Sequence, residues 1–186
     1  MNSRSKLRDM LLSKSVRTGD FTLASGKKSD LYVDCRVTAM DCHGARWVGE
    51  CGWDLVRERA LAEGVDAIGG MTMGADPISL AVGMESARRH DGKEAIQVFT
   101  VRKEPKGHGR GKQIEGNFSE GNRIIVVDDV ITTGGSTVKA IEAIRREGGE
   151  VAFALVLVDR EEGGREAIEE AGVPVLSLFT RTELLG

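Results

Sequence analysis

The chain has 186 residues, of which 40% are hydrophobic and 30% charged, and its formal net charge is −3. This length and balance predict one soluble globular domain with a proper core. The sequence shows neither a signal peptide nor an apolar run of about 18 residues, so we expect a cytoplasmic protein that does not cross a membrane. An aromatic content of 4% and the acidic total argue against a nucleic-acid partner.

Cysteine usage points to a reducing compartment. The chain has three cysteines, Cys35, Cys42 and Cys51, and no Cys-x-x-Cys pair. An odd number without paired spacing argues against both a disulfide framework and a zinc site. We expect reduced and mostly buried thiols.

The N-terminal part combines a short helix with a hairpin. Residues Ser3 to Leu12 have the apolar spacing of an amphipathic helix. Between Phe21 and Asp34, two short strand-like pieces flank a Ser-Gly turn. From the residues alone, this is a surface hairpin with solvated lysines.

A long helix and a strand-to-helix unit follow. Residues Cys42 to Glu63 form an amphipathic helix, and small residues on its apolar side predict close packing. Val65 to Gly70 is a predicted strand, followed by a loop to Asp76 and a helix that opens at Pro77. Ligands bind at the carboxyl ends of strands in open α/β sheets, so this loop is a candidate ligand loop. A plain β-to-α connection is the alternative.

The most basic segment follows the strand Ala95 to Val101. It has three glycines, no hydrophobic periodicity and only Glu104 as an acid, so we expect an exposed, mobile loop. A run of this kind usually marks a solvated surface or a nucleic-acid contact. Its cationic side chains are Arg102, Lys103, Lys106, His108, Arg110 and Lys112.

The most informative stretch begins with Ile124 to Val127, a β-branched run typical of a strand buried on both faces. Two acids come next, then a loop of hydroxyl residues and glycines, then a helix that Gly148 ends. Glycines allow close backbone approach, and a helix N-terminus suits phosphate. Asp128 and Asp129 would repel a phosphate that they touched, so they should face another part of the ligand, such as sugar hydroxyls or the water shell of a metal. The alternative is an ordinary turn with Ser and Thr caps.

The last part repeats the pattern. Val151 to Val158 is a strand that ends in Asp159 and Arg160, and Gly163 to Ala171 is a helix before a final strand. Strands thus alternate with helices, which predicts an α/β fold with a Rossmann-like parallel sheet flanked by helices. The expected strands are residues 65–70, 95–101, 123–129, 151–158 and 173–178.

Several of these stretches resemble one enzyme family. Arg123 to Val138 resembles the phosphoribosyl-diphosphate (PRPP) motif of type I phosphoribosyltransferases: four hydrophobic residues, two acids, two hydrophobic residues and a Thr/Gly-rich loop. The order Arg-Lys-x-x-Lys-x-His-Gly from Arg102 resembles the catalytic loop of orotate phosphoribosyltransferases, and Phe21 to Asp34 resembles their N-terminal hood. The resemblance covers nearly the whole chain. It implies the type I phosphoribosyltransferase fold in one domain, residues 1–186, with a hood at about 1–40 and a core at about 41–186.

The resemblance also implies a reaction: orotate and PRPP give orotidine 5′-monophosphate and diphosphate, in pyrimidine biosynthesis. It assigns catalysis to Lys106, His108, Asp128 and Asp129. PRPP contacts fall on Thr72, Arg102, Lys103, Lys106, His108, Asp128, Asp129, Val130, Ile131, Thr132, Thr133, Gly134, Gly135 and Ser136. Orotate contacts fall on Tyr32, Val33, Thr132 and Arg160. Mg²⁺ is expected as cofactor, held through substrate and water without a direct protein ligand.

The resemblance also concerns the assembly of the protein, and two positions differ from the family pattern. The resemblance implies a homodimer in which the basic loop of each subunit completes the site of its partner. Many family members carry lysine at the positions of Ala24 and Met73, and this chain does not. Two alternatives are a phosphoribosyltransferase for uracil or a purine, and a non-catalytic PRPP-sensing regulator that binds nucleic acid. Arg160 and the basic loop with Lys106 and His108 count against both.

Overall fold

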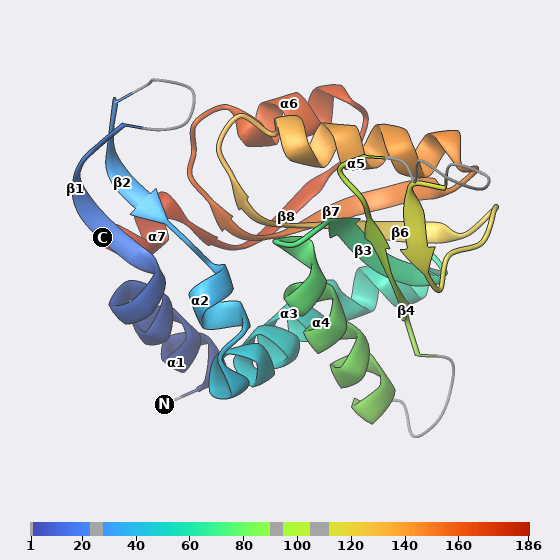
Figure 1. Ribbon diagram of the computed structural model, residues 1–186. Helices are drawn as coiled ribbons and strands as arrows, with labels where there is room; N and C mark the ends of the chain where they lie inside the picture. Colours follow the sequence, from blue (N-terminus) through green and yellow to red (C-terminus); the bar gives the residue numbers. More distant parts are fainter. Residues whose placement is uncertain (1, 23–27, 90–94, 105–111) are drawn as a thin grey trace.

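The core of the computed structural model is a six-stranded sheet with the strand order β5-β4-β3-β6-β7-β8 (Figure 1). The structure describes residues 2–22, 28–89, 95–104 and 112–186. Strands β3, β4, β6, β7 and β8 are parallel, and β5 pairs antiparallel with β4 at one edge. The strands are β3 (Ala67–Met71), β4 (Gln97–Val101), β5 (Ile114–Gly116), β6 (Arg123–Ile131), β7 (Glu150–Asp159) and β8 (Val175–Thr180).

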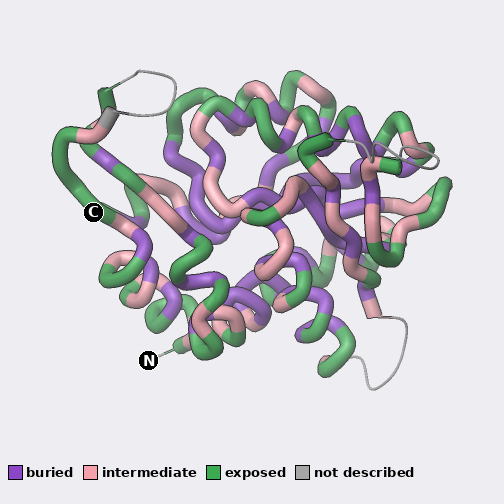
Figure 2. The backbone as a smooth tube through the Cα atoms, viewed as in Figure 1, coloured by how far each residue is buried: buried purple, intermediate pink, exposed green. Residues whose placement is uncertain are grey.

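Helices cover both faces of the sheet. Helices α3 (Cys42–Ala62) and α4 (Ala75–Arg89) lie on one face, and α5 (Gly135–Arg146) and α6 (Gly164–Glu170) lie on the other (Figure 1). The buried apolar residues accordingly form two clusters, one on each side of the sheet. The buried segments lie mostly in the central strands, while exposed ones follow the outer sides of the helices (Figure 2).

Strand β6 shows why its sequence does not alternate. Ile125 and Val127 belong to the cluster under α3 and α4, whereas Ile124 and Val126 belong to the cluster under α5. All four side chains are at most 1% exposed. A strand with helices on both faces needs apolar residues at every position, which explains the continuous β-branched run.

The N-terminal part forms a separate unit of sheet. Helix α1 (Ser3–Met10) continues as a π-helical turn, and β1 (Val16–Thr22) then pairs antiparallel with β2 (Lys28–Val33). Among the described residues, neither of its strands pairs with a strand of the six-stranded sheet. The chain enters α3 through the short helix α2 (Arg36–Ala39). The two paired strands of the predicted hairpin are confirmed, although β1 begins at Val16 rather than near Phe21. The predicted Ser-Gly turn lies outside the described residues.

The predicted parallel α/β arrangement with its five strands is confirmed. The hydrophobic pattern of the sequence does not predict β5, α2 or α7 (Arg181–Leu185), which are short and carry little periodicity. Helix α4 begins at Ala75, so Pro77 lies within its first turn rather than opening it. Gly148, with φ of 84°, provides the predicted left-handed turn after α5.

The predicted close packing of the long helix is also confirmed. A Cβ on Gly49 would lie 2.6 Å from the carbonyl oxygen of Ala81, and one on Gly52 would lie 2.6 Å from Cγ2 of Val82. Helices α3 and α4 therefore approach each other closely, and this contact holds α4 and the loop before it.

Two expectations from composition can be compared with the structure. Cys35 and Cys51 are buried, Cys42 is exposed, and all three are free thiols. Within the described ranges, none of the helices combines the length and the apolar character needed to cross a membrane.

Candidate active site

A cavity of about 290 Å³ lies at the carboxyl ends of the parallel strands. It forms where β3 pairs with β6 on one side and with β4 on the other, because these pairings bring the loops after the three strands side by side. The hood contributes the remaining wall. The lining residues are Tyr32, Val33, Asp34, Arg36, Met71, Thr72, Met73, Gly74, Lys103, Asp128, Asp129, Val130 and Ser136.

Asp128 joins the end of β6 to the first turn of α5. Its Oδ2 accepts hydrogen bonds from Oγ of Ser136 at 2.8 Å and Oγ1 of Thr137 at 2.6 Å, and its Oδ1 accepts one from the backbone N–H of Asp129 at 3.0 Å. The residue is 6% exposed. Asp128 therefore shapes the loop as well as lining the cavity, and the buried hydroxyl of Thr137 points inward.

Asp129 faces the cavity, and the guanidinium of Arg36 in the same lining interacts with it electrostatically. Burial, followed by the negative charge of Asp128, raises the pKa of Asp129 to about 6. A Cβ on Gly74 would overlap with the carboxylate of Asp129, so only glycine allows the loop after β3 to lie against it. The acid is thus held at the point where two loops meet.

The loop between β6 and α5 presents backbone N–H groups. Gly134, with φ of 75°, is the N-cap of α5, and no side chain caps the helix. The interpretation of this stretch as an ordinary turn with Ser and Thr caps is therefore wrong. A Cβ on Gly134 would lie 2.6 Å from the carbonyl oxygen of Gly164, so the loop also packs tightly against the start of α6. The first turn of α5 is left open to an anion.

The loop after β3 is held by Asp76, an acid that was not predicted as a site residue. Asp76 accepts hydrogen bonds from Oγ1 of Thr72 at 2.7 Å and Oγ1 of Thr100 at 2.5 Å. It thereby joins this loop to the end of β4, just before the basic segment. An acid in the first turn of a helix beside a threonine-containing loop is the signal that could have revealed it.

The comparisons with known proteins agree with this geometry. Residues 80–172 match the model of the phosphoribosyl transferase domain. The chain is 44% identical to the orotate phosphoribosyltransferase of Aquifex aeolicus, over 100% of this chain and 99% of that protein. It is 42% identical to the Rhodopseudomonas palustris enzyme of the same name, over 98% and 96%. The chain belongs to the orotate phosphoribosyltransferase family.

Solved structures of family members have the same fold. The Mycobacterium tuberculosis orotate phosphoribosyltransferase in complex with PRPP has a TM-score of 0.76 and 32% identity, and the match covers 98% of this chain and 99% of that one. The same enzyme in complex with Fe(III) dicitrate has a TM-score of 0.81 and 34% identity, with both chains covered in full. An adenine phosphoribosyltransferase from Leishmania tarentolae, at 15% identity and a TM-score of 0.65, shares the fold alone.

The residues that the family resemblance assigns to orotate are not all in the cavity. Tyr32 and Val33 line it, and the ring of Tyr32 lies 5.8 Å from that of Phe21. Arg160 is not among the lining residues, although its backbone N–H donates to the carbonyl oxygen of Ile131 on the same rim. Its guanidinium contacts the hood instead, through Oγ of Ser29 at 2.8 Å.

Part of the predicted catalytic loop can be placed. Lys103 lines the cavity, and Arg102 pairs with Glu115 at 3.7 Å. Lys106 and His108, together with the predicted mobility of this loop, lie outside the described residues. In the PRPP loop, Val130 and Ser136 line the cavity, while Ile131, Thr132, Thr133, Gly134 and Gly135 continue along the same rim.

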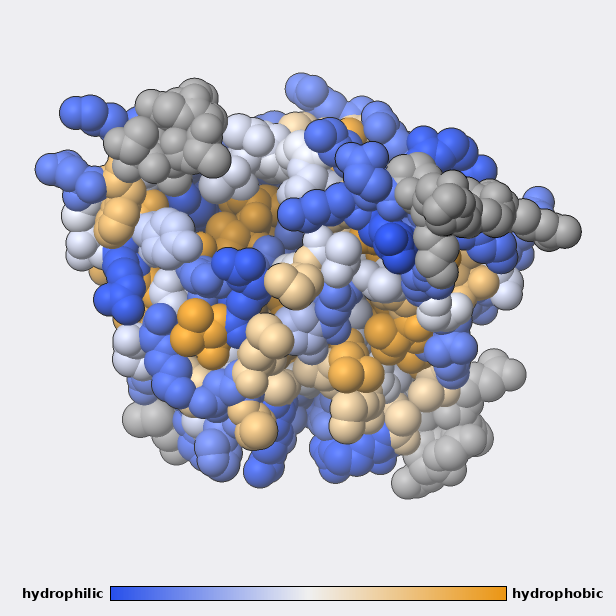
Figure 3. Space-filling view, viewed as in Figure 1, coloured by the Kyte–Doolittle hydropathy of each residue, from blue (hydrophilic) through white to orange (hydrophobic). Residues whose placement is uncertain are grey.

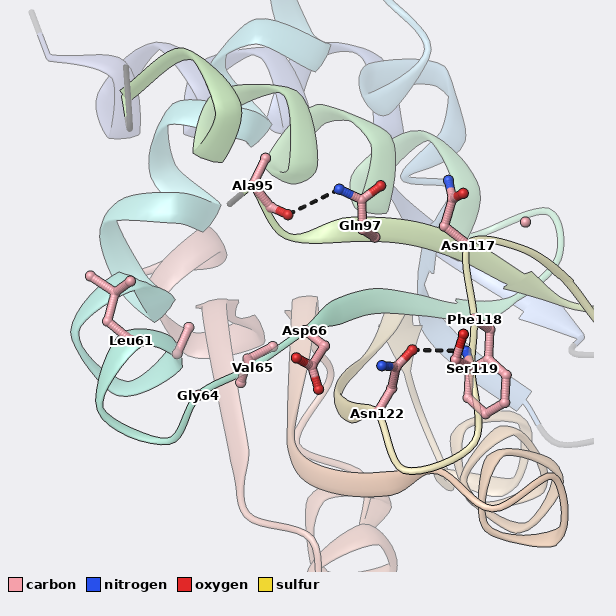
Figure 4. Close-up of a pocket in the computed structure, with 12 residues that line it drawn as sticks. Leu61, Gly64, Val65, Asp66, Ala95, Gln97, Asn117, Phe118, Ser119 and Asn122 are labelled. Atoms are coloured by element: carbon pink, nitrogen blue, oxygen red, sulfur yellow. Dashed lines mark hydrogen bonds between the residues drawn. The ribbon is translucent and has the colours of Figure 1, made fainter. Parts of the chain in front are cut away.

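A larger cavity, of about 770 Å³, lies at the opposite ends of the strands (Figure 4). Its lining includes a single acid, Asp66, whose Oδ2 already accepts a hydrogen bond from the backbone N–H of Arg123 at 2.7 Å. Asn122 is likewise engaged with the backbone N–H of Ser119 at 2.8 Å. Among the described residues, this lining has neither paired acids nor a cation, whereas the cavity at the other rim has both.

The raised pKa of Asp129 leads to a prediction about stability. Its native pKa of about 6 exceeds the ordinary 3.8, so the charged carboxylate opposes folding above pH 6, and this cost declines as the pH falls toward 3.8. Asp129→Asn should therefore raise the thermal midpoint at a pH of about 7.5, and the gain should shrink on acidification to about pH 5.

Thermal unfolding across this pH range measures the effect. The matched control is Glu58→Gln, on the exposed face of α3, which should leave the midpoint and its pH dependence unchanged. A midpoint for Asp129→Asn that stays below that of the wild type at every pH would contradict this electrostatic account.

Proposed function

We propose that this site transfers the phosphoribosyl group of PRPP to orotate, giving orotidine 5′-monophosphate and diphosphate in pyrimidine biosynthesis. One observation carries the proposal: the acid pair of β6, the loop after β3 and Tyr32 of the hood meet in a single cavity. Full-length relatives named orotate phosphoribosyltransferase support this substrate over another base or a non-catalytic regulator.

The chemistry demands a site that stabilises positive charge. As the orotate nitrogen approaches the anomeric carbon and diphosphate leaves, the ribose ring gains oxocarbenium character. The carboxylate of Asp129 accepts hydrogen bonds from the ribose hydroxyls, and its negative charge stabilises the ring in the transition state. Asp128 lines the same wall and keeps Ser136 and Thr137 in place. The open first turn of α5, after Thr132, Thr133, Gly134 and Gly135, receives the 5′-phosphate.

The leaving diphosphate needs positively charged side chains around it. Lys103 already lines the cavity, and Arg102 lies next to it at the start of the basic loop. In the proposed closed state, Lys106 and His108 cover the diphosphate and exclude water, and His108 donates a proton to it. Thr72 and its loop, held by Asp76, form the floor.

Magnesium fits the electrostatics of this cavity. Burial, followed by the negative charge of Asp128, raises the pKa of Asp129, so a cation beside this wall would stabilise its charged form. Mg²⁺ bound together with PRPP would neutralise charge on the leaving group. Asp129 would hold it through water.

Removal of the metal tests this cofactor. A chelator in excess should lower turnover by roughly 10² or more, the scale of one lost electrostatic group, and added Mg²⁺ should restore it. Calorimetry should show in parallel that orotate binding to the free enzyme does not depend on the metal. Full turnover in the presence of the chelator would refute the Mg²⁺ requirement.

Arg160 is the proposed partner of the orotate carboxylate or ring oxygen. The residue is 3% exposed, and its Nη2 donates to Ser29 and to Glu162. Its Nε is buried and has no hydrogen-bond partner among the described residues. A planar guanidinium with a free donor suits an acidic planar ring. Tyr32, Val33 and Thr132 complete the proposed orotate contacts.

Arg160→Ala should therefore weaken orotate binding at least tenfold and leave PRPP binding nearly unchanged, because a charged hydrogen bond contributes roughly 1.5 to 3 kcal/mol. Calorimetry with each substrate measures both affinities. Glu162→Gln is the control, because it removes the ion-pair partner of Arg160 without removing the guanidinium. Equal weakening of both substrates would assign Arg160 to the fold.

A homodimer is the proposed assembly. The face that carries α2 and α4 gathers apolar side chains at the surface (Figure 3). An apolar patch of this kind typically marks a protein interface. We propose that a second copy covers this patch, and that the basic loop of each subunit reaches the site of its partner. The exposed fractions are 49% for Val37, 70% for Met40, 54% for Leu80 and 65% for Met84.

Mixing two inactive variants tests the shared site. In a hybrid of Lys106→Ala with Asp128→Asn/Asp129→Asn, one subunit keeps the acid pair and the other keeps the loop. A loop that acts across the interface rebuilds one working site per hybrid, so activity should return. Native mass spectrometry of tagged chains must show that subunits have exchanged. Activity that stays at the level of the separate variants would then exclude the shared site.

The hood and the core form one catalytic unit in this proposal. Contacts from Arg160 to Ser29 and from Arg181 to Asp30, the latter at 2.6 Å, join β2 to the core. We also infer a cytoplasmic location from the composition and the free thiols. Cell fractionation tests this location, and recovery of the protein in another compartment would contradict it.

A further inference from the structure

The inference concerns Arg36, which opens α2 directly after the hood strand β2. It rests on the proposed function, because it assigns a residue to the diphosphate of PRPP. The described lining of the cavity has three acids, Asp34, Asp128 and Asp129, but only two cations, Arg36 and Lys103. A diphosphate that enters this cavity is repelled by the acids unless cationic donors receive it.

The loop after β3 does not supply such a donor. Met73 lines the cavity with an uncharged side chain that is 63% exposed, and Thr72 donates its hydroxyl to Asp76. Gly74 lies against Asp129. On this side of the cavity, only backbone groups are left for an anion. The positive charge must come from another wall.

Arg36 is held in a position that suits this task. Its Nε donates to Oδ1 of Asp34 at 2.8 Å, and its Nη2 donates to Oδ2 at 2.9 Å. The backbone N–H of Arg36 also donates to Oδ1 of Asp34 at 3.1 Å. These two parallel side-chain hydrogen bonds, here called the fork, fix the orientation of the guanidinium before any ligand binds. Asp34 itself is fixed, because its backbone N–H donates to the carbonyl oxygen of Ser15 at 2.9 Å.

The fork leaves donors for a ligand. Nε and Nη2 use two of the five N–H bonds of the guanidinium. The Nη1 of Arg36 donates no hydrogen bond to any residue in the described ranges. The side chain is 45% exposed, so these donors are accessible from the cavity. Both oxygens of Asp34 face Arg36, so the remaining N–H groups point away from that acid.

We propose that Arg36, oriented by Asp34, binds the diphosphate group of PRPP and the diphosphate product, and supplies the positive charge that Met73 does not. A preorganised guanidinium loses little freedom on binding and suits the oxygens of a phosphate group. Orotate is the other anion that enters this cavity, so the test must separate the two.

Calorimetry with four probes in Mg²⁺ buffer makes this separation: inorganic diphosphate, PRPP, ribose 5-phosphate and orotate. Arg36→Ala should weaken the binding of diphosphate and PRPP by about tenfold or more, the effect of one charged hydrogen bond. Binding of ribose 5-phosphate and orotate should stay within about twofold, as for a substitution away from the contact. Arg36→Lys should recover part of the diphosphate affinity, because it keeps the charge but loses the fork.

The control Arg57→Ala removes an exposed arginine of α3 outside the cavity and should change none of the four affinities. Diphosphate binding by Arg36→Ala within about twofold of the wild type would overturn the inference, and so would an equal loss for orotate. If Arg36→Ala does not fold, Arg36→Lys provides the same comparison, and a loss confined to diphosphate and PRPP supports the inference. A wild-type protein that binds neither ribose 5-phosphate nor PRPP would instead overturn the proposed function.

Discussion

Burial of β6 on both faces is the constraint on which the rest of the structure depends. Because Ile124 to Val127 pack alternately against the two helical layers, the strand cannot shift by one residue without exposing apolar side chains or burying Arg123. This fixed register sets the acid pair at the rim of the sheet. The neighbours of β6, strands β3 and β7, then place Thr72 and Arg160 on the same rim.

The second constraint is electrostatic. Two adjacent carboxylates at the end of a buried strand are costly, and the structure compensates them unequally. Asp128 receives two hydroxyl hydrogen bonds and one from a backbone N–H, whereas burial and the negative charge of Asp128 raise the pKa of Asp129. The negative charge of the two acids therefore favours the binding of a ligand with cationic character. An oxocarbenium-like ribose with its bound metal has this property.

The hood and the basic loop supply the positive charge that the diphosphate requires. A diphosphate cannot be received by the wall of acids, so its donors must lie on segments that reach the cavity from elsewhere. Arg36 comes from the hood side and Lys103 from the end of β4. The apolar face beside these segments, with Met40 and Met84 exposed, connects the same region to the proposed partner subunit. Charge separation within the site therefore depends on parts of the chain that are far apart in sequence.

The sequence by itself determined the alternation of strands and helices, the acid pair with its glycine loop and the basic segment, because each depends on neighbouring residues: unbroken β-branched runs, turn glycines and local charge. Only the tertiary structure decided which of these meet. The hydrogen bond from Thr100 to Asp76, the contact of Arg160 with Ser29 and the contact of Gly74 with Asp129 depend on strand order and helix packing. The short strand β5 escaped prediction for the same reason, since its pairing with β4 stabilises it rather than its own propensity. Helix α7 differs, because the capping box of Thr180 and Glu183 is a local signal that the sequence already carries.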